Sequence, residues 1–251
     1  MKRWLSNIFR TAGTTERSLW TQSFLQQAVH ASTTHRFVYV CNPKVGCSSI
    51  IWSLRRLEAG NPNMVPDTVG DIHDRSASPL LRLSRVDDFE HLLADTDCFR
   101  FTFVRNPFDR LLSCYLQKIV RPTHVRATLL RLLGRPIDDE SEITFEDFVR
   151  TIADQDPIDM DPHWRVQSVQ TLQEHVSYDF IGRFESFDHD LASVGEKIAP
   201  ATSEFIYTEK RQATGVKPYH LITPPLAKII HDVFEEDFRR FDYPNDVPVA
   251  P

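Results

Sequence analysis

The sequence of 251 residues lacks long hydrophobic runs and has no excess of positive charge. No apolar stretch approaches the roughly 18 residues needed to cross a bilayer, and the N-terminal MKRWLSNIFR lacks the apolar core of a secretory signal. The net charge of −6 argues against a protein that binds nucleic acid by neutralising phosphates. We therefore expect a soluble, cytoplasmic protein without nucleic-acid partners, with peripheral membrane association through the N-terminal residues as the alternative.

Cysteine is scarce as well. The four cysteines, at positions 41, 47, 98 and 114, form no Cys-x-x-Cys pair, and no histidine stands at zinc-ligand spacing from them. The sequence therefore predicts no metal site and no redox dithiol, and we expect reduced thiols.

Linkers and internal repeats are also lacking. No Gly/Ser-rich or Pro-rich segment divides the chain, which is long enough for one large domain with a substantial core. The predicted organisation is an N-terminal helical extension over residues 1–35, followed by a single domain over residues 36–245.

The stretch YVCNPKVGCSSIIWSL, residues 39–54, places a lysine between a strand-like and a helical segment. The apolar run 36–41 predicts a buried strand, and the residues from 50 to 57 repeat at helical spacing, with Ser48 or Ser49 as the expected N-cap. The loop between them presents backbone N–H groups and the positive end of a helix dipole, which suits an anion. Lys44 adds a full positive charge.

A second strand, predicted over residues 98–104, leads directly into RNPFDRLLSCY. A helix is expected from Pro107, with Asn106 as N-cap, and it carries a polar face that includes Arg110, Ser113 and Gln117. Arg105 at the strand end and Ser113 on the helix can both contact one phosphate. A solvated polar face explains this pattern better if it is taken alone, whereas the Lys44 loop beside it favours an anion site.

The remaining patterns also alternate between helix and strand. Helices are predicted near residues 87–94, in TFEDFVRTIA after Thr144 and in LAKIIHDVFEEDFRRF after Thr223, and a third strand is predicted over residues 178–184. This alternation predicts an α/β fold with a mainly parallel sheet, which binds ligands at the carboxyl ends of its strands.

Taken together, these motifs resemble those of the Golgi-type carbohydrate sulfotransferases (sulfotransferase family 2) and their bacterial relatives. The resemblance is carried by NPKVGCSSI, FVRNPFDRLLSCY, HWRVQ (residues 163–167) and YDFIGRFESFDHDL (residues 178–191), with a weaker echo in EEDFRRFDY. It implies a P-loop-kinase-like parallel sheet flanked by helices. It also implies transfer of a sulfuryl group from 3′-phosphoadenosine 5′-phosphosulfate (PAPS) to a hydroxyl-bearing acceptor, with a carbohydrate expected.

The resemblance further implies which residues bind the donor. The first loop is expected to hold the 5′-phosphosulfate, and Arg105 and Ser113 the 3′-phosphate. Lys210 and Arg211 are expected to contact the nucleotide, although solvated surface charge explains them equally well. The loop residues are Lys44, Val45, Gly46, Cys47, Ser48 and Ser49.

Two other classes of function remain open. An ATP-dependent kinase also grips phosphate between a strand and a helix, but its loop pattern GxxxxGK[ST] places the lysine late, whereas Lys44 precedes the glycine here. A non-catalytic nucleotide-binding module would keep both anion sites but lack a general base. The base therefore discriminates between an enzyme and a binding module.

Sulfuryl transfer to a hydroxyl requires a group that accepts its proton, and histidine has a suitable pKa. His73 lies where related heparan-type sulfotransferases carry an active-site histidine, while His163 belongs to the HWRVQ motif and also fits a role in shaping the acceptor site. We place His73 ahead of His163 as the base, and a structural role is the alternative for each. Lys44 is expected to neutralise charge on the leaving oxygen.

The stretch RPTHVRATLLRLLGRP is basic and carries no motif of its own. Its arginines would line a cleft for an acidic acceptor, or the segment would form an amphipathic lid. These arginines are Arg121, Arg126, Arg131 and Arg135. The acceptor itself is not encoded in any recognisable pattern.

Overall fold

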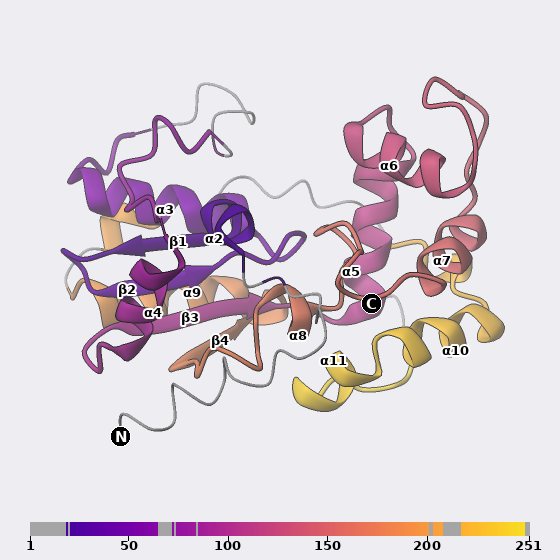
Figure 1. Ribbon diagram of the computed structural model, residues 1–251. Helices are drawn as coiled ribbons and strands as arrows, with labels where there is room; N and C mark the ends of the chain where they lie inside the picture. Colours follow the sequence, from indigo (N-terminus) through magenta and orange to yellow (C-terminus); the bar gives the residue numbers. More distant parts are fainter. Residues whose placement is uncertain are drawn as a thin grey trace, which may run out of the picture.

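A four-stranded sheet forms the centre of the described part of the protein, with its strands in the order β1-β2-β3-β4 (Figure 1). The computed structural model describes residues 19, 21–64, 72, 74–83, 85–200, 203–207 and 217–248. The strands are β1 (Val29–Ser32), β2 (Phe37–Val40), β3 (Phe99–Val104) and β4 (Phe180–Arg183). The last three are parallel, and β1 pairs with β2 in the antiparallel sense. The predicted α/β fold with a mainly parallel sheet is confirmed.

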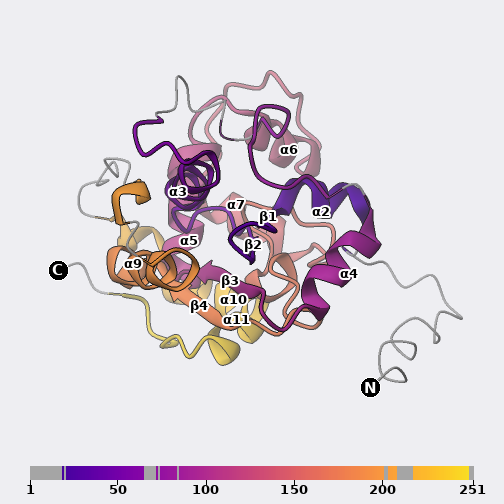
Figure 2. The same ribbon diagram turned by 90° about the vertical axis from the view of Figure 1, so that its left-hand side faces the viewer.

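Helices cover both faces of the sheet (Figure 2). Phe37 and Tyr39 of β2 belong to the buried cluster under α3 and α9, whereas Val38 and Val40 belong to the cluster under α2 and α4. Successive side chains of a strand point to opposite faces, so both faces of β2 are apolar and its sequence is a continuous apolar run. The covering helices are α2 (Gln22–Ala28), α3 (Cys47–Ala59), α4 (Val86–Ala94) and α9 (Phe187–Ile198).

A second group of helices gathers beyond the end of the sheet at which β3 leads into α5 (Figure 1). Their apolar core surrounds Phe148 and Trp164, whose rings meet edge to face at 5.7 Å. The elements are α5 (Pro107–Cys114), the π-helix η2 (Tyr115–Ile119), α6 (His124–Leu132), α7 (Phe145–Ala153), α8 (Gln167–Gln170), α10 (Pro224–Val233) and α11 (Glu235–Arg240). Short 3-10 helices among the described residues are η3 (Phe184–Ser186), η4 (Ser203–Phe205) and η5 (Tyr219–Leu221). The carboxyl ends of β2 and β3 therefore lie between the two groups of helices.

Several local predictions are confirmed. The predicted strands 36–41 and 98–104 correspond to β2 and β3, and 178–184 contains β4. Asn106 caps α5 with Pro107 at the first position, and its side chain accepts a hydrogen bond from the Phe108 N–H. Thr144 and Asp147 form a capping box at the start of α7. Each of these features depends on residues only a few positions apart, so it can be predicted from the sequence alone.

Other local predictions are wrong. The N-cap of α3 is Gly46 in the left-handed conformation, while Ser48 and Ser49 already lie inside the helix. Within the predicted helical extension, α2 is helical, but residues 29–32 form β1, because pairing with β2 satisfies their backbone groups. The boundary between residues 1–35 and 36–245 stays a prediction. None of the described helices is both long and apolar enough to span a membrane.

Candidate functional site

The loop between β2 and α3 has a strained backbone. Both Lys44 and Gly46 have positive φ, 76° and 84°. A Cβ atom on Gly46 would lie 2.5 Å from Cε2 of Phe187, so glycine is required here both for its conformation and for its size. A non-glycine residue in this region costs on the order of 1 kcal/mol and is typical of functional sites. The shape of the loop must therefore be held by contacts from elsewhere.

Arg110 of α5 supplies one of these contacts and links the loop to a second segment. Its Nε donates to the Pro43 carbonyl at 3.1 Å, and its two terminal nitrogens donate to the carbonyls of Arg165 and Pro162 at 2.7 and 2.9 Å. Burial lowers the pKa of Arg110 to about 10, so the guanidinium is charged at neutral pH. One buried cation therefore fixes the Lys44 loop against the segment that contains His163.

Lys44 carries a positive charge that no carboxylate neutralises within the described ranges. Its Nζ donates to Oε1 of Gln117 on η2, at 2.5 Å. Its pKa is lowered to about 8, first by burial and then by the positive charges of Lys118 and Arg105, although Cys114 and Cys47 oppose the shift. Because its neutral partner leaves the charge uncompensated, this ammonium group favours an anion beside it.

The first turn of α3 adds uncapped backbone donors beside Lys44. Gly46 has no side chain to accept a hydrogen bond from this turn, and no acidic residue occurs in it. Val45 and Ser49 are buried, whereas Cys47 and Ser48 are partly exposed. An anion over the loop would meet the N–H groups of this 13-residue helix and its dipole.

Cys47 has an unusually acidic thiol. Its pKa is lowered to about 7, first by the hydrogen bond with Cys41, and further by the charge of Lys44 and by backbone hydrogen bonds, although burial opposes the shift. The same pair raises the pKa of Cys41. Negative charge is thus favoured at this point of the loop even on a residue that is ordinarily neutral.

Arg105 lies at the end of β3 and is only 7% exposed. One terminal nitrogen donates to the Lys44 carbonyl at 3.1 Å, the guanidinium stacks on the Phe184 ring at 4.1 Å, and its buried Nε has no hydrogen-bond partner in the described part of the chain. A buried donor without a partner is costly, so this geometry favours a ligand that accepts from it.

The carboxylates near Arg105 are engaged elsewhere. Asp109 accepts hydrogen bonds from Lys217 Nζ and Tyr219 Oη, both at 2.6 Å. Glu185 accepts one from Tyr243 Oη at 3.0 Å. Their charges act on Arg105, but none of the ion pairs seen among the described residues includes it. The guanidinium therefore keeps a surplus of positive charge.

The polar face predicted for α5 is mostly internal. Arg110 and Asn106 are buried, so the alternative that this face is solvated is wrong for these two residues. Of the four polar residues on the face, Ser113 and Gln117 are partly exposed. Ser113 lies on the last turn of α5, and its hydroxyl forms no hydrogen bond that the structure describes. It remains a candidate ligand residue with a free hydroxyl group.

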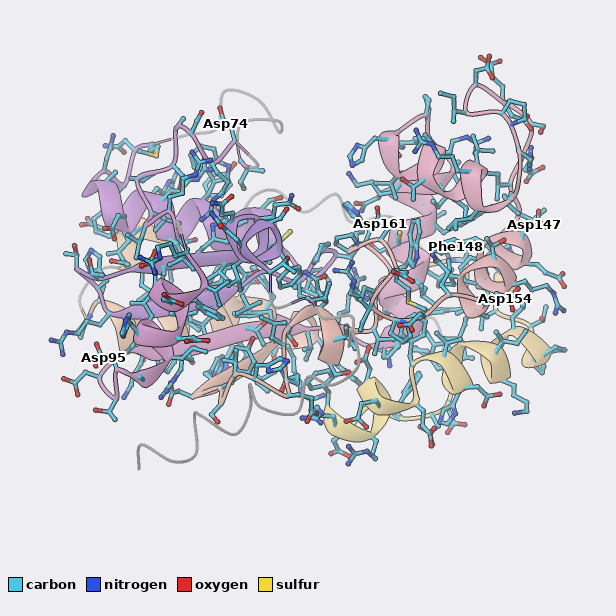
Figure 3. All side chains as sticks on the ribbon, viewed as in Figure 1. Asp74, Asp95, Asp147, Phe148, Asp154 and Asp161 are labelled. Atoms are coloured by element: carbon cyan, nitrogen blue, oxygen red, sulfur yellow. The ribbon has the colours of Figure 1, made fainter. Side chains whose placement is uncertain are left out.

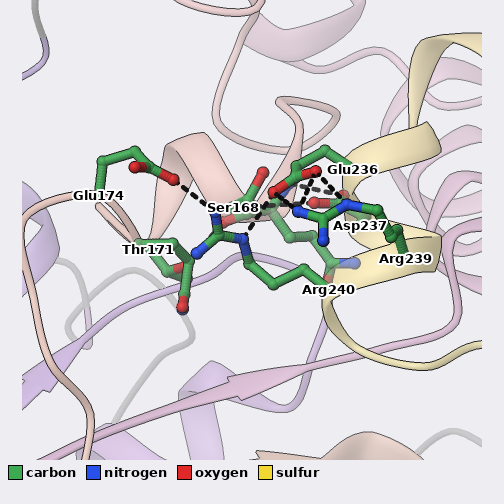
Figure 4. Close-up of polar contacts among 9 residues, drawn as sticks. Ser168, Thr171, Glu174, Glu236, Asp237, Arg239 and Arg240 are labelled. Carbon is green, nitrogen blue, oxygen red and sulfur yellow. Dashed lines mark hydrogen bonds and ion pairs between the residues drawn. The ribbon is translucent and has the colours of Figure 1, made fainter.

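Gln167 is the main site residue that the sequence did not reveal. Its Oε1 accepts from Asn42 Nδ2 and from the Arg105 N–H, both at 3.0 Å, and its Nε2 donates to the Arg105 carbonyl at 2.8 Å. Asp237 of α11 accepts from the N–H groups of Gln167 and Ser168 at 2.7 and 2.8 Å; Figure 4 shows Asp237 beside Ser168. The only available signal was the final position of HWRVQ. Gln167 thus joins the first loop to the β3–α5 junction.

His163 is placed beside the Lys44 loop by Arg110, which donates to the carbonyls of Pro43 and Pro162. Its ring Nδ1 lies 2.8 Å from Oδ1 of Asp161, which Figure 3 shows in the half of the molecule that contains Phe148. Burial lowers the pKa of His163; the Asp161 carboxylate opposes this shift, while Lys118 and Lys44 add to it. The structure therefore brings together Lys44, Arg105 and His163. The other predicted residues His73, Lys210 and Arg211 lie outside the described residues.

The basic stretch of residues 121–136 is used largely for internal contacts. Arg126 is buried and donates to the carbonyls of Ile119 and Ser141, both at 2.7 Å. Arg135 pairs with Asp139 at 2.7 Å. Arg126 therefore has a structural role, whereas Arg135 is partly exposed and Arg121 and Arg131 are exposed. Whether the stretch lines a cleft or forms a lid stays a prediction. Nowhere in the described ranges do three or more His, Cys, Asp or Glu side chains gather as a metal site would require.

Comparison with known proteins agrees with the motifs. A family model described as "Sulfotransferase family" matches residues 28–244. Carbohydrate sulfotransferase 14 of Danio rerio is 29% identical over 252 residues, which cover 90% of this chain and 66% of the relative. The Mus musculus protein of that name is 32% identical over 238 residues, covering 88% and 61%. Carbohydrate sulfotransferase 10 of Danio rerio is 25% identical over 277 residues, covering 95% and 71%. The chain thus spans about two thirds or less of the first two relatives, and no solved structure matches it significantly.

Proposed function

The chain belongs to the sulfotransferase family, and on this basis we propose that it transfers a sulfuryl group from PAPS to a hydroxyl group of a carbohydrate. The matched relatives are named as carbohydrate sulfotransferases, which supports the acceptor class. The relatives are longer than this chain, so their activity is transferred to it as a proposal only.

One observation carries the donor assignment: two positively charged groups, neither of which forms an ion pair with a carboxylate of the described residues, meet at the carboxyl ends of β2 and β3. The Arg105 guanidinium donates to the carbonyl of Lys44, so the two anion sites share a backbone contact. A nucleotide with phosphosulfate at the 5′ position and phosphate at the 3′ position carries anionic groups at two separate points, and it fits this pair better than a nucleotide with one phosphate chain.

The proposed roles follow from the chemistry of each group. The uncapped first turn of α3 and Lys44 bind the 5′-phosphosulfate. The unpartnered Nε of Arg105 and the hydroxyl of Ser113 bind the 3′-phosphate. Lys44 neutralises charge on the leaving oxygen, and His163 accepts the proton of the acceptor hydroxyl. The proposal takes His163 as the base in place of His73, which the sequence put first, because the contacts of His163 are described and His73 lies outside the described residues. Lys210 and Arg211 stay predictions from the sequence, and the proposal assigns no role to a metal ion.

The donor proposal predicts a preference among nucleotides. The protein should bind 3′-phosphoadenosine 5′-phosphate (PAP) about 10- to 100-fold more tightly than adenosine 5′-phosphate, because the 3′-phosphate adds charge-assisted hydrogen bonds worth about 1.5–3 kcal/mol. It should also prefer PAP over ATP. Calorimetric titration of the three nucleotides measures this without an acceptor. Equal affinities for PAP and ATP would instead support a kinase-like site.

The Arg105 site predicts a selective loss of affinity. Arg105→Ala should weaken PAP binding about 10- to 100-fold and bring it close to that of adenosine 5′-phosphate, because only the 3′-phosphate loses its partner. Ser113→Ala, which leaves the hydrogen bond from Arg105 to Lys44 intact, should cause a smaller loss in the same direction. Binding of both nucleotides is measured by calorimetry.

The control for this pair of variants is Arg150→Ala, which removes an exposed arginine of α7 that pairs with Glu146. Its PAP affinity should equal that of the parent. If Arg105→Ala weakened both nucleotides equally, the arginine would act by holding the loop and would not bind the 3′-phosphate.

A further inference from the structure

Asp161 and His163 form a closely spaced pair within the Asp-Pro-His sequence. Oδ1 of Asp161 accepts a hydrogen bond from the backbone N–H of His163 at 2.9 Å and lies 2.8 Å from the ring Nδ1. Both side chains are mostly buried, with 14% and 21% of their surfaces exposed. One carboxylate oxygen therefore holds both the backbone and the ring of His163.

The ionisation of Asp161 fixes where the His163 proton resides. Burial raises the pKa of Asp161, but the hydrogen bonds from the ring and the backbone N–H of His163 outweigh it, so the pKa is lowered overall. An ionised carboxylate only accepts hydrogen bonds, so the ring Nδ1 must donate. In neutral His163 the lone pair is then on Nε2, for which the described residues provide no hydrogen-bond partner.

The position of the ring relative to Lys44 is fixed as well. Arg110 donates to the carbonyls of Pro43 and Pro162, one on each side of the site. The next residue, Trp164, is fully buried, donates to Gln155 Oε1 at 2.9 Å and packs against Phe148. The segment of residues 161–165 is therefore anchored on both sides of His163, and Figure 3 shows Asp161 in the same half of the molecule as Phe148.

The charges around His163 are mostly positive. Lys118 of η2 and Lys44 of the first loop both lower its pKa, and the ring of His124 on α6 lies 6.3 Å from it, centroid to centroid. Among the charges that act most strongly on His163, Asp161 is the one carboxylate. A proton that arrives on this ring would be repelled by its other neighbours and stabilised by Asp161.

We infer that Asp161 is a positioning residue for sulfuryl transfer: it holds His163 with its proton on Nδ1 and so directs Nε2 to the acceptor hydroxyl. The inference rests on the proposed function. The acceptor oxygen forms a bond to sulfur while its proton passes to Nε2. The bond between sulfur and the 5′-phosphate oxygen breaks, and its electron pair stays on that oxygen beside Lys44. Asp161 keeps its negative charge throughout and stabilises the imidazolium that forms.

The test compares two aspartates of the same loop. Asp161→Asn keeps the size of the side chain but removes the charge. Asp156→Asn is the matched control, because Asp156 Oδ1 also accepts from the N–H two residues later, that of Ile158 at 3.0 Å, but is exposed and contacts no histidine. Transfer is measured with radiolabelled PAPS and chemically desulfated chondroitin sulfate as the carbohydrate acceptor.

Asp161→Asn should lower kcat about 10²-fold, at the lower end of what a general base contributes. PAP affinity and the KM for the acceptor should remain within about twofold of the parent, since the Asp161 carboxylate is engaged by His163 and is assigned no contact with either substrate. The acid limb of the kcat–pH profile should move to lower pH, because loss of the carboxylate lowers the pKa of His163 and the base stays neutral further into acid. Asp161→Glu should restore part of the rate, and Asp156→Asn should match the parent throughout.

A second measurement does not depend on the acceptor. The imidazole ¹⁵N spectrum of the parent, assigned by the signal lost in His163→Gln, should show a protonated Nδ1 and an unprotonated Nε2 at high pH. Asp161→Asn should show a mixture of the two tautomers. A parent ring protonated on Nε2, or an Asp161→Asn variant that retains the parent kcat and pH profile, would overturn the inference.

Failure of the inference can be separated from failure of the proposed function. If Asp161→Asn behaves as Asp156→Asn while the parent still prefers PAP over ATP, only the role of Asp161 is wrong. If the parent binds PAP and ATP equally, the sulfotransferase proposal itself fails, whatever tautomer His163 adopts. In an active parent, Asp161→Asn should have little further effect once His163 is replaced, because the carboxylate acts through the ring.

Discussion

Replacement of Lys44 by methionine should lower the rate of sulfuryl transfer by about 10²- to 10³-fold, the usual effect of removing one group that stabilises developing negative charge. Charge on the leaving oxygen grows only as the bond to sulfur breaks, so the loss should appear in kcat more than in PAP affinity. Methionine fills the buried space of the lysine stem without its charge. Single-turnover kinetics and calorimetry measure the two quantities separately.

Lys228→Met is a suitable control for this prediction, because Lys228 is an exposed residue of α10 that pairs with Asp232. It should leave both quantities unchanged. An equal loss of transfer rate and PAP affinity in Lys44→Met would mean that Lys44 only grips the donor and gives no added stabilisation in the transition state.

Because the pKa of Lys44 is lowered, its role in stabilising charge on the leaving oxygen should also affect the dependence of kcat/KM on pH. Its charged form is lost as pH rises through about 8, so kcat/KM should fall there. Lys44→Arg keeps a charge at all these pH values and should remove this limb. Cys47, with a pKa of about 7, becomes negative in a similar range, so Cys47→Ser must retain the limb if Lys44 is its source.

Replacement of His163 by alanine should reduce transfer by about 10²- to 10⁴-fold, the range that a positioned general base contributes. PAP binding should change little, because a base acts on the acceptor hydroxyl and not on the donor phosphates. Rates are measured at saturating donor and acceptor, with PAP affinity and the thermal midpoint as checks of folding. His163→Gln serves where the alanine variant is unstable.

His73→Ala is the decisive comparison, since the sequence placed His73 ahead of His163. Under the present proposal it should retain at least about a tenth of the parent rate, a smaller loss than removal of a base produces. A reversed outcome, in which His73→Ala abolishes transfer and His163→Ala merely raises the acceptor concentration at half-maximal rate, would assign the base to His73 and an acceptor-shaping role to His163.

Much of the fold could be predicted because its signals are local. The apolar runs of β2 and β3, the Asn106–Pro107 start of α5 and the Thr144 capping box each depend on residues within a few positions of one another. Hydrogen bonds and apolar patterns among residues a few positions apart can be predicted directly from the sequence. The two anion-binding motifs belong to the same class, because each is a strand end followed by a helix start.

Two errors arose where packing outweighed local preference. Ser48 and Ser49 are good N-cap residues, yet the N-cap of α3 is Gly46, two or three residues earlier, because the packing of Phe187 against Gly46 and the strained Lys44 conformation set the course of the loop. The four residues of β1 carry no strong strand pattern of their own, and they form a strand because β2 lies beside them. Phe187 is far from Gly46 in the sequence and meets it only in the fold. β2 follows β1 closely in the sequence, but the strand form of β1 depends on its pairing with β2.

The sequence by itself therefore determined the α/β class, the family motifs and the residue types that can bind anions. Tertiary structure alone decided how these residues act together: Lys44 meets Gln117 across 73 residues, and Asn42 meets Gln167 across 125. It also assigned Arg126 to a structural role and joined the His163 segment to the Lys44 loop through Arg110. The physical reason is that charge, burial and proton position depend on groups within a few ångströms in space, and residue order specifies such neighbours only through the completed fold.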